Sequence, residues 1–185
     1  MINQQLRQIR SLLRRREIKL SDALLIVLRH LRTRLPAERL LWLNRELLGY
    51  TKEDLPQLYE KSRMKHFSIF RLTSKPCELE IPEYRFLAGT WAKIDEDCHL
   101  VGASEPHLND RSIFCNIGIQ QIETQLEEID NPSAHMLSMS ADTETGSEFY
   151  CWSTELVRIN DAVRNKLCQF IEIVIEELKL PSNDR

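Results

Sequence analysis

The period of the hydrophobic residues changes along this 185-residue chain, and that change limits the fold more than any other feature. Apolar residues recur every three or four positions in the first 50 residues and again near the end, as on amphipathic helices. From about residue 67 they alternate with polar residues, as in strands that bury one face. The pattern predicts an α+β fold with an N-terminal three-helix unit, a small central antiparallel sheet and a long C-terminal helix.

Three helices are expected in the first 50 residues. The first spans about residues 2–17, and the second begins at Ser21, whose hydroxyl suits an N-cap. Pro36 suits the first turn of the third helix, and Gly49 is expected to end it as a left-handed C-cap. The apolar stripes predicted to be buried are Ile2, Leu6, Ile9 and Leu13 in the first helix and Leu24, Leu25, Leu28 and Leu31 in the second.

Short strands and two further helices are expected after residue 65. The segments "HFSIFRLT", "PCELEIP" and "YRFLAGTWAKI" are predicted strands, and Thr51 with Asp54 is a predicted N-cap before them. Residues 112–129 are expected to pass from a strand into a helix. Residues 135–156 are predicted to form two strands joined at Thr145-Gly146, and Asn160 is predicted to cap a helix over about 161–179. We place a subdomain boundary near residue 65, so that a helical subdomain (residues 1–65) and an α+β subdomain (residues 66–185) together form one compact domain.

Charge is distributed unevenly along the chain. Residues 1–50 contain eleven Lys or Arg and four Asp or Glu, which leaves 14 basic and 24 acidic residues in the remainder. The two segments are therefore expected to attract each other, although a basic helical surface also suits a nucleic acid or a protein partner. The residues that would make such a contact are Arg7, Arg10, Arg14, Arg15 and Arg16.

Two patterns indicate the compartment. No apolar run reaches the roughly 18 residues of a membrane helix, and the basic start of the chain lacks the apolar core of a secretory signal. The five cysteines are scattered, at positions 77, 98, 115, 151 and 168, and form no CxxC pair. This pattern favours reduced thiols over a disulfide framework. We expect a cytoplasmic protein that does not enter a membrane.

The motifs that would indicate a common enzyme class are missing from the sequence. It contains no GxGxxG, no GK[ST] phosphate loop and no GxSxG elbow. Cys98, His99, His107 and Cys115 are possible zinc ligands, but their spacing fits no known knuckle. The acidic run at residues 95–97 could hold a divalent cation loosely, and a solvated loop is the stronger interpretation. We therefore assign no catalytic, cofactor-binding or metal-binding residue, and an enzyme is the less favoured hypothesis.

Two arginines lie among apolar neighbours. Arg85 and Arg164 are interpreted as buried anchors between elements, since a long side chain can lay its stem on a core, and anion binding is the alternative. Glu46 is expected to be a surface carboxylate paired with a nearby arginine.

One stretch resembles a known family. "LSDALLIVLRHLRTRLPAERLLWLNRELLGY" is similar to the N-terminal signature of the AbiTii family of bacterial abortive-infection proteins, in which an apolar helix leads to a tryptophan, an EL-x-GY ending and a Pro-Tyr segment. "PEYR", "IGIQQIETQLEE" and "INDAVRNKLCQFIEIVIEEL" resemble later segments, so the likeness covers most of the chain. Leu48 stands where the family usually has Asn. The matching residues, interpreted as structural, are Trp42, Glu46, Leu47, Gly49, Tyr50, Tyr84, Arg85 and Arg164.

This resemblance implies a role in antiphage defence, and it supplies no catalytic residues. The leading hypothesis is a non-enzymatic module that binds a protein partner or a second copy. The alternative is a nucleic-acid-binding regulator or nuclease that uses the basic N-terminal helices. Trp42 and Tyr50 are expected to anchor the end of the third helix.

Overall fold

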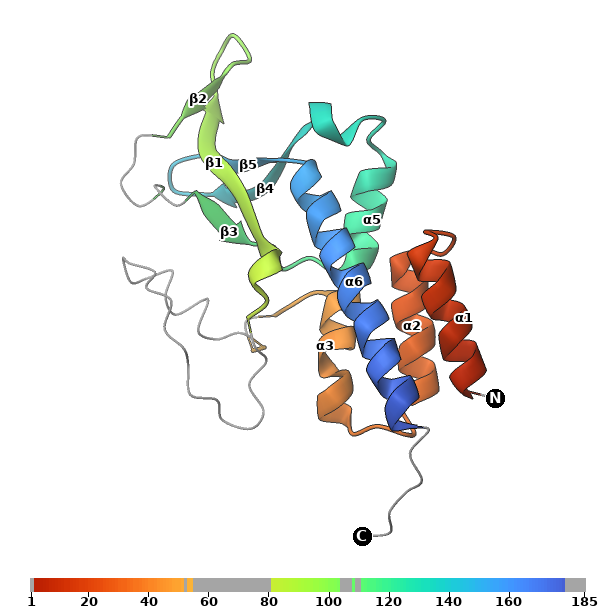
Figure 1. Cartoon of the computed structure of the whole chain (residues 1–185). Helices are drawn as coiled ribbons and strands as arrows, with labels where there is room; N and C mark the ends of the chain where they lie inside the picture. Colours follow the sequence, from red (N-terminus) through yellow and green to blue (C-terminus); the bar gives the residue numbers. More distant parts are fainter. Residues whose placement is uncertain (1, 52, 55–80, 104–107, 109–110, 179–185) are drawn as a thin grey trace. The chain divides into compact units, whose positions relative to one another are not determined.

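A computed structural model of the chain describes residues 2–51, 53–54, 81–103, 108 and 111–178 (Figure 1). The predicted strands "HFSIFRLT" and "PCELEIP" fall almost entirely outside these residues. The chain divides into two compact units, which are interleaved in the sequence. A helical unit comprises residues 1–49, 118–123 and 160–185, and a sheet unit comprises residues 50–117 and 124–159. The α+β class predicted from the periodicity is confirmed.

The helical unit contains the three N-terminal helices and segments of two later ones. Their bounds are α1, Ile2–Arg14; α2, Leu20–Leu31; α3, Ala37–Leu48; α5, Ile119–Glu127; and α6, Thr154–Glu177. In Figure 1, α1, α2, α3 and the C-terminal half of α6 run side by side. Each presents an apolar stripe to its neighbours, and the core is assembled from these stripes.

The core of the helical unit follows the predicted stripes except at Ile2, which is half-buried, and at two residues of α2. Leu6, Ile9 and Leu13 of α1 are buried, as expected. On α2 the buried residues are Leu20, Ala23, Leu24, Val27 and Leu31, whereas Leu25 is 37% exposed and Leu28 is half-buried. The buried face of α2 is therefore rotated from the prediction, because Leu20 and Val27 extend the stripe on the other side of Leu24. Leu25 is left at the surface.

The N-terminus of α2 is capped by a residue from a distant segment of the sequence. The Glu123 carboxylate accepts hydrogen bonds from the backbone N–H groups of Leu20, at 2.7 Å, and Ser21, at 3.2 Å. The N-cap position is occupied by Lys19, whose side chain makes no capping bond. The predicted Ser21 N-cap is therefore wrong, since a carboxylate supplied by α5 satisfies these N–H groups instead.

Two glycines meet where α3 ends. Gly49 is the C-cap, as predicted, with φ 100° and ψ 175°, a conformation open almost only to glycine and different from the left-handed helical one. A Cβ atom on Gly118 would lie 2.3 Å from the Leu47 carbonyl oxygen and 2.8 Å from the Gly49 nitrogen. The backbone before α5 can therefore approach the end of α3 only because residue 118 has no side chain.

The last helix starts earlier than predicted. It begins at Thr154, so Asn160 lies inside α6 and the predicted Asn160 cap is wrong. Leu156 and Ile159 are fully buried and continue the apolar period that Val163 and Leu167 carry forward. Because this period begins before Asn160, the helix extends over residues 154–159 as well.

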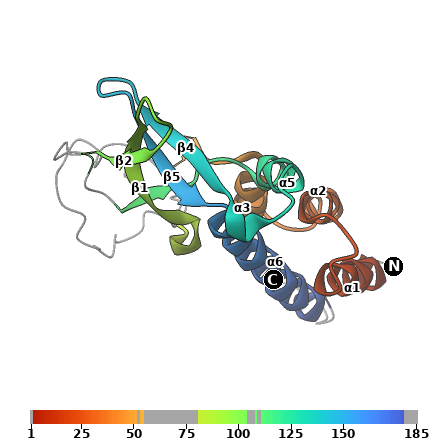
Figure 2. The same ribbon diagram turned by 90° about the horizontal axis from the view of Figure 1, so that it is seen from above.

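The described residues of the sheet unit form five antiparallel strands in one sheet. They are β1, Phe86–Ile94; β2, Leu100–Gly102; β3, Ser112–Phe114; β4, Met136–Asp142; and β5, Ser147–Trp152. The order is β2-β1-β5-β4, with β3 also paired to β1, and Figure 2 shows β1, β5 and β4 side by side. The predicted pair of strands around Thr145-Gly146 is confirmed as β4 and β5. Strand β2 was not predicted.

The predicted strand at residues 84–94 begins later in the structure. Tyr84 and Arg85 belong to a 3-10 turn, Glu83–Arg85, and β1 starts at Phe86. Arg158 fixes this turn, since its guanidinium donates to the carbonyl oxygens of Tyr84 at 3.1 Å and Phe86 at 2.5 Å. Arg158 also pairs with Glu155 at 2.8 Å, and Glu155 accepts from the Ala88 N–H. Capture of these carbonyls by a side chain shortens the strand.

Within the described residues of the chain, no helix combines the length and the apolar character needed to span a membrane.

Four cysteines of the described residues are free thiols: Cys98, Cys115, Cys151 and Cys168. Cys98 is exposed and the other three are buried.

Candidate functional site

The residues of the family-like motif on α3 are partly or fully buried in the helical unit. The Trp42 ring packs edge-on against Phe170 of α6, with ring centroids 5.3 Å apart, and the Lys166 ammonium lies 4.8 Å from its centroid. Trp42 is half-buried, and both of these partners belong to α6. Leu47 is buried, and Glu46 is fully buried. The predicted surface position of Glu46 is therefore wrong.

Tyr50 and Arg85 form one contact group in the sheet unit. The Arg85 guanidinium lies 5.4 Å from the centroid of the Tyr50 ring, and that ring packs edge-on against Phe114 at 5.5 Å. Arg85 is fully buried and donates from Nη1 to the Ile117 carbonyl oxygen at 2.6 Å. A buried guanidinium needs such acceptors to offset its lost hydration. These contacts fit the predicted anchoring role of Arg85.

Arg164 anchors α6 to the end of α1. Its Nη1 donates to the carbonyl oxygen of Leu13 at 3.2 Å, and Leu13 lies in the last turn of α1, where carbonyls lack intrahelical partners. Burial lowers the pKa of Arg164, and the nearby charge of Arg16 lowers it further. The contact fits the anchor interpretation, although the partner is a backbone carbonyl and not an acid.

Most of the arginines proposed for partner or nucleic-acid contact are held by acidic residues of α6. Arg10 lies 2.7 Å from Glu172, and Arg14 lies 3.9 Å from the same carboxylate. Arg16 pairs with Asp161 at 2.9 Å. The attraction predicted between the basic start and the acidic remainder thus occurs within the helical unit.

The other two arginines of that set differ from each other. Arg15 contacts Ser11 at 3.0 Å and Glu17 at 3.4 Å, both within its own segment. Arg7 is exposed and has no ion pair among the residues that the structure describes. It is the member of the predicted set that is left to the solvent.

A second group of unpaired arginines was missed by sequence reasoning. Arg29, Arg32 and Arg34 are exposed at the end of α2, and none has an ion pair within the described ranges. A signal for them exists in the sequence, since no acidic residue stands between Asp22 and Glu38. Cations at a helix C-terminus also interact favourably with the helix dipole. We call Leu25, Arg29, Arg32 and Arg34 the α2 corner.

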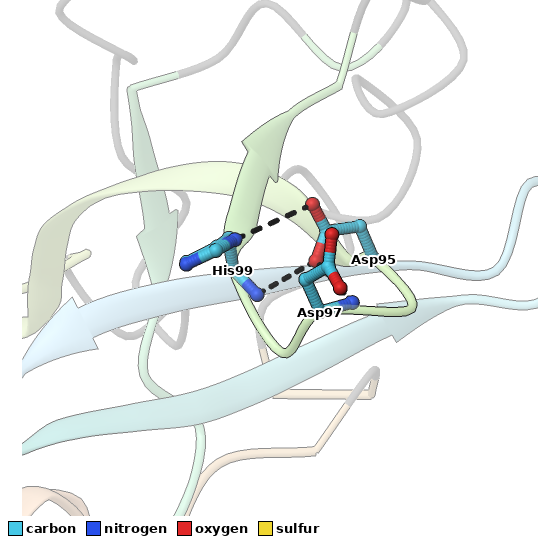
Figure 3. A group of neighbouring side chains, drawn as sticks. All are labelled: Asp95, Asp97 and His99. Carbon is cyan, nitrogen blue, oxygen red and sulfur yellow. Dashed lines mark hydrogen bonds and ion pairs between the residues drawn. The ribbon is translucent and has the colours of Figure 1, made fainter.

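The loop between β1 and β2 gathers two carboxylates and an imidazole. One possible ligand atom from each of Asp95, Asp97 and His99 lies within 4.8 Å of the others, and all three residues are exposed (Figure 3). Oxygen and imidazole donors of this kind suit Mg²⁺, Mn²⁺ or Zn²⁺. However, one Asp95 oxygen already accepts from the N–H groups of Asp97, at 3.0 Å, and His99, at 2.8 Å. These hydrogen bonds account for the cluster as a turn, so we assign it no metal.

Among the described residues, the zinc candidates of the sequence form no group of possible ligands. Cys98 is exposed whereas Cys115 is buried, and neither belongs to the cluster of Asp95, Asp97 and His99. His107 lies outside the described residues.

Burial and structural hydrogen bonds shift the pKa values of two cysteines and one glutamate. Burial raises the pKa of Cys151 to about 11 and also raises the pKa of Cys168, so neither is an activated nucleophile. Burial opposes ionisation of Glu155, but hydrogen bonds from Arg158 and Ala88 outweigh it and lower the pKa of the carboxyl. Glu155 thus acts as a hydrogen-bond acceptor in the fold.

The end of the β1–β2 hairpin is apolar and exposed. Ile94, Leu100 and Val101 are 59%, 44% and 51% exposed. Single exposed apolar residues are common, and here three lie close together on one short hairpin. We call residues 94–101 the hairpin tip. Sequence reasoning missed it because β2 has only three residues.

Comparisons with models of protein families, with curated proteins and with solved structures found no match to this chain.

Proposed function

We propose that this chain is an AbiTii-like module of bacterial antiphage defence that acts in the cytoplasm by contact with a protein partner or a second copy, and not by catalysis. The defence role is supported by the signature around Trp42 and Tyr50 and by the similar later segments. The contact role is carried by one observation, the exposure of Ile94, Leu100 and Val101 at the hairpin tip.

The ion pairs of the helical unit support contact with protein over contact with nucleic acid. Arg10, Arg14 and Arg16 lie against Glu172 and Asp161, so a phosphate backbone would have to displace carboxylates to reach them. Arg39 is likewise held by Glu177, at 2.8 Å and 3.1 Å. A nucleic-acid groove made of these arginines is the less favoured alternative.

The defence role is tested in cells. A bacterial strain that expresses the chain is challenged with a panel of phages, and the efficiency of plating is compared with that of an empty-vector strain. A fall for at least one phage is the expected result. Equal plating for every phage, with the protein present and folded, would contradict the proposal.

The contact role is tested with purified protein. Light scattering and native mass spectrometry measure its mass over a range of concentrations, and labelled DNA and RNA are titrated at two ionic strengths. Self-association or a stable protein complex is expected. Nucleic-acid binding that weakens steeply with salt, from a protein that stays monomeric, would favour the alternative.

A further inference from the structure

The hairpin tip combines an apolar stem with an acidic end. Every residue from Ile94 to Val101 is exposed, and Asp95, Glu96 and Asp97 are consecutive carboxylates. Ile94 and Leu100 are opposite each other in the β1–β2 pairing, so both side chains lie on one face of the ribbon. Val101 lies opposite Lys93 on the other face. The tip thus offers apolar area on both faces beside three negative charges.

Hydrogen bonds hold the tip in one conformation. The Asp95 N–H donates to the His99 carbonyl at 3.0 Å, and the Cys98 N–H donates to the Asp95 carbonyl at 3.1 Å. The Asp95 carboxylate also accepts from two backbone N–H groups of the loop. A surface already ordered in this way loses little conformational entropy when it binds.

The α2 corner has the opposite character. Leu25 and Arg29 lie one turn apart on a face of α2, and the C-cap Arg32 continues the helical spacing. Arg34 lies two residues further on. Leu25 is 37% exposed, and none of the three guanidinium groups has an ion pair in the described ranges. By contrast, Arg10, Arg16 and Arg39 each lie within 3 Å of a carboxylate oxygen. The α2 corner therefore gathers three positive charges that have no ion pair among the described residues.

We propose that the hairpin tip of one copy docks onto the α2 corner of a second copy. Three carboxylates meet three guanidinium groups, and the Ile94–Leu100 face covers Leu25. This inference rests on the proposed contact function and specifies its geometry. Contact between two tips is disfavoured because six carboxylates would meet, and contact between two corners is disfavoured by the same repulsion between arginines.

Such a contact joins two different surfaces of the chain. If two copies exchange tip and corner reciprocally, a two-fold dimer results, whereas a pair joined by a single tip–corner contact keeps one free tip and one free corner. In the second case the assembly grows into a closed ring or an open chain.

The test uses two sets of substitutions in the full chain. The tip variant carries Glu96→Gln, Asp97→Asn and Leu100→Ser, and leaves Asp95 to hold the loop. The corner variant carries Arg29→Gln, Arg32→Gln and Arg34→Gln. A control variant carries Arg7→Gln and Glu144→Gln, which neutralise exposed charges outside both surfaces. Circular dichroism and thermal melting confirm that every variant folds.

Mass is then measured by light scattering at about 0.1 M and 1 M salt, where the screening length falls from about 10 Å to about 3 Å. The native protein is expected to form species larger than a monomer that dissociate at high salt. The tip variant and the corner variant each associate at least about tenfold more weakly than the native protein, whereas the control behaves like it. An equimolar mixture of the two variants forms a 1:1 dimer and no larger species, because it contains one intact tip and one intact corner per pair.

Three results would overturn the proposal. These are a native protein that is monomeric at every concentration, a variant of either surface that assembles like the native protein, and a mixture of the variants that stays monomeric. Binding of a labelled oligonucleotide that the corner variant loses, with assembly unchanged, would assign the corner to nucleic acid instead. Phage plating separates this inference from the proposed function. Protection without tip–corner assembly refutes only the docking geometry, and assembly without protection refutes only the defence role.

Discussion

Glu123 caps a helix that begins more than 100 residues earlier in the chain: its carboxylate accepts hydrogen bonds from the backbone N–H groups of Leu20 and, beside it, Ser21. A charged acceptor at a helix N-terminus satisfies orphan donors and interacts favourably with the helix dipole. Glu123 therefore links α5 to α2 within the helical unit.

Replacing this carboxylate is expected to destabilise the protein. Glu123→Ala should lower the free energy of unfolding by about 1–2 kcal/mol, as loss of an N-cap does. Ser21→Ala should change it by less than about 0.5 kcal/mol, because Ser21 is not the cap. Urea unfolding of both variants measures this, with Glu128→Ala, an exposed position just beyond α5, as the control. A larger loss for Ser21→Ala than for Glu123→Ala would restore the serine cap and contradict the structure.

Gly118 and Gly102 offer a matched pair of substitutions. A Cβ on Gly118 would lie 2.3 Å from the Leu47 oxygen, whereas nothing lies within 4 Å of a Cβ on Gly102. Gly118→Ala should therefore cost about 2 kcal/mol or more, since backbone atoms must move apart. Gly102→Ala should be neutral or stabilising by about 0.5 kcal/mol, because it restricts the unfolded chain. Thermal melting of the two variants checks this, and equal melting temperatures would show that the approach to Leu47 is not tight.

The Glu155–Arg158 pair predicts a dependence of stability on pH. The pKa of Glu155 in the folded protein is lower than the ordinary value of 4.5, because hydrogen bonds from Arg158 and Ala88 outweigh its burial. The ionised carboxylate therefore stabilises the fold at neutral pH, and this contribution is lost as the pH falls below 4.5 through the lower folded pKa. In Glu155→Gln, the free energy of unfolding should therefore fall less steeply as the pH is lowered below 4.5. Denaturant unfolding between about pH 7 and pH 3 measures the effect. If the variant lost stability in acid as steeply as the native protein, Glu155 would not be the cause of that loss.

The free thiols are expected to differ in reactivity. Burial raises the pKa of Cys151 to about 11, so at about pH 8 only about one thiol in a thousand is ionised. Cys98 is exposed and should react with iodoacetamide first. Peptide mapping by mass spectrometry after timed alkylation distinguishes the two positions. Modification of Cys151 as fast as Cys98 in folded protein would mean that the core around β5 opens readily.

The elements that the sequence predicts well are those with a local cause. The stripe of Leu6, Ile9 and Leu13 defines α1 because helical spacing alone brings these residues to one face. The paired strands β4 and β5 follow from alternation on both sides of a turn at Thr145-Gly146. Local patterns of this kind are sufficient for the α+β class.

The predictions that failed depend on distant partners. Ser21 is a good N-cap by its type, but Glu123 takes that role from another helix. Asn160 is a good cap as well, yet burial of Leu156 and Ile159 extends α6 past it. In both cases tertiary packing outweighs a local preference.

Only some of the candidate site was predictable. A basic N-terminal segment is visible in the sequence, but which arginines are left unpaired depends on the positions of Glu172, Asp161 and Glu177 along α6. Arg29, Arg32 and Arg34 could have been noticed from the missing acids around them. The exposed hairpin tip could not, because three residues of β2 are too few for a periodic pattern.

The pairing of α1 with α6 has a consequence for synthesis on the ribosome. Residues 1–49 are synthesised long before residue 160, where the third segment of the helical unit begins. Synthesis proceeds at about 5–20 residues per second, so Glu172 and the apolar face of α6 are made on the order of ten seconds after α1, α2 and α3. During that interval their leucine stripes and unpaired arginines are open to chaperones, so the nascent chain is most vulnerable to aggregation and proteolysis before its last helix emerges.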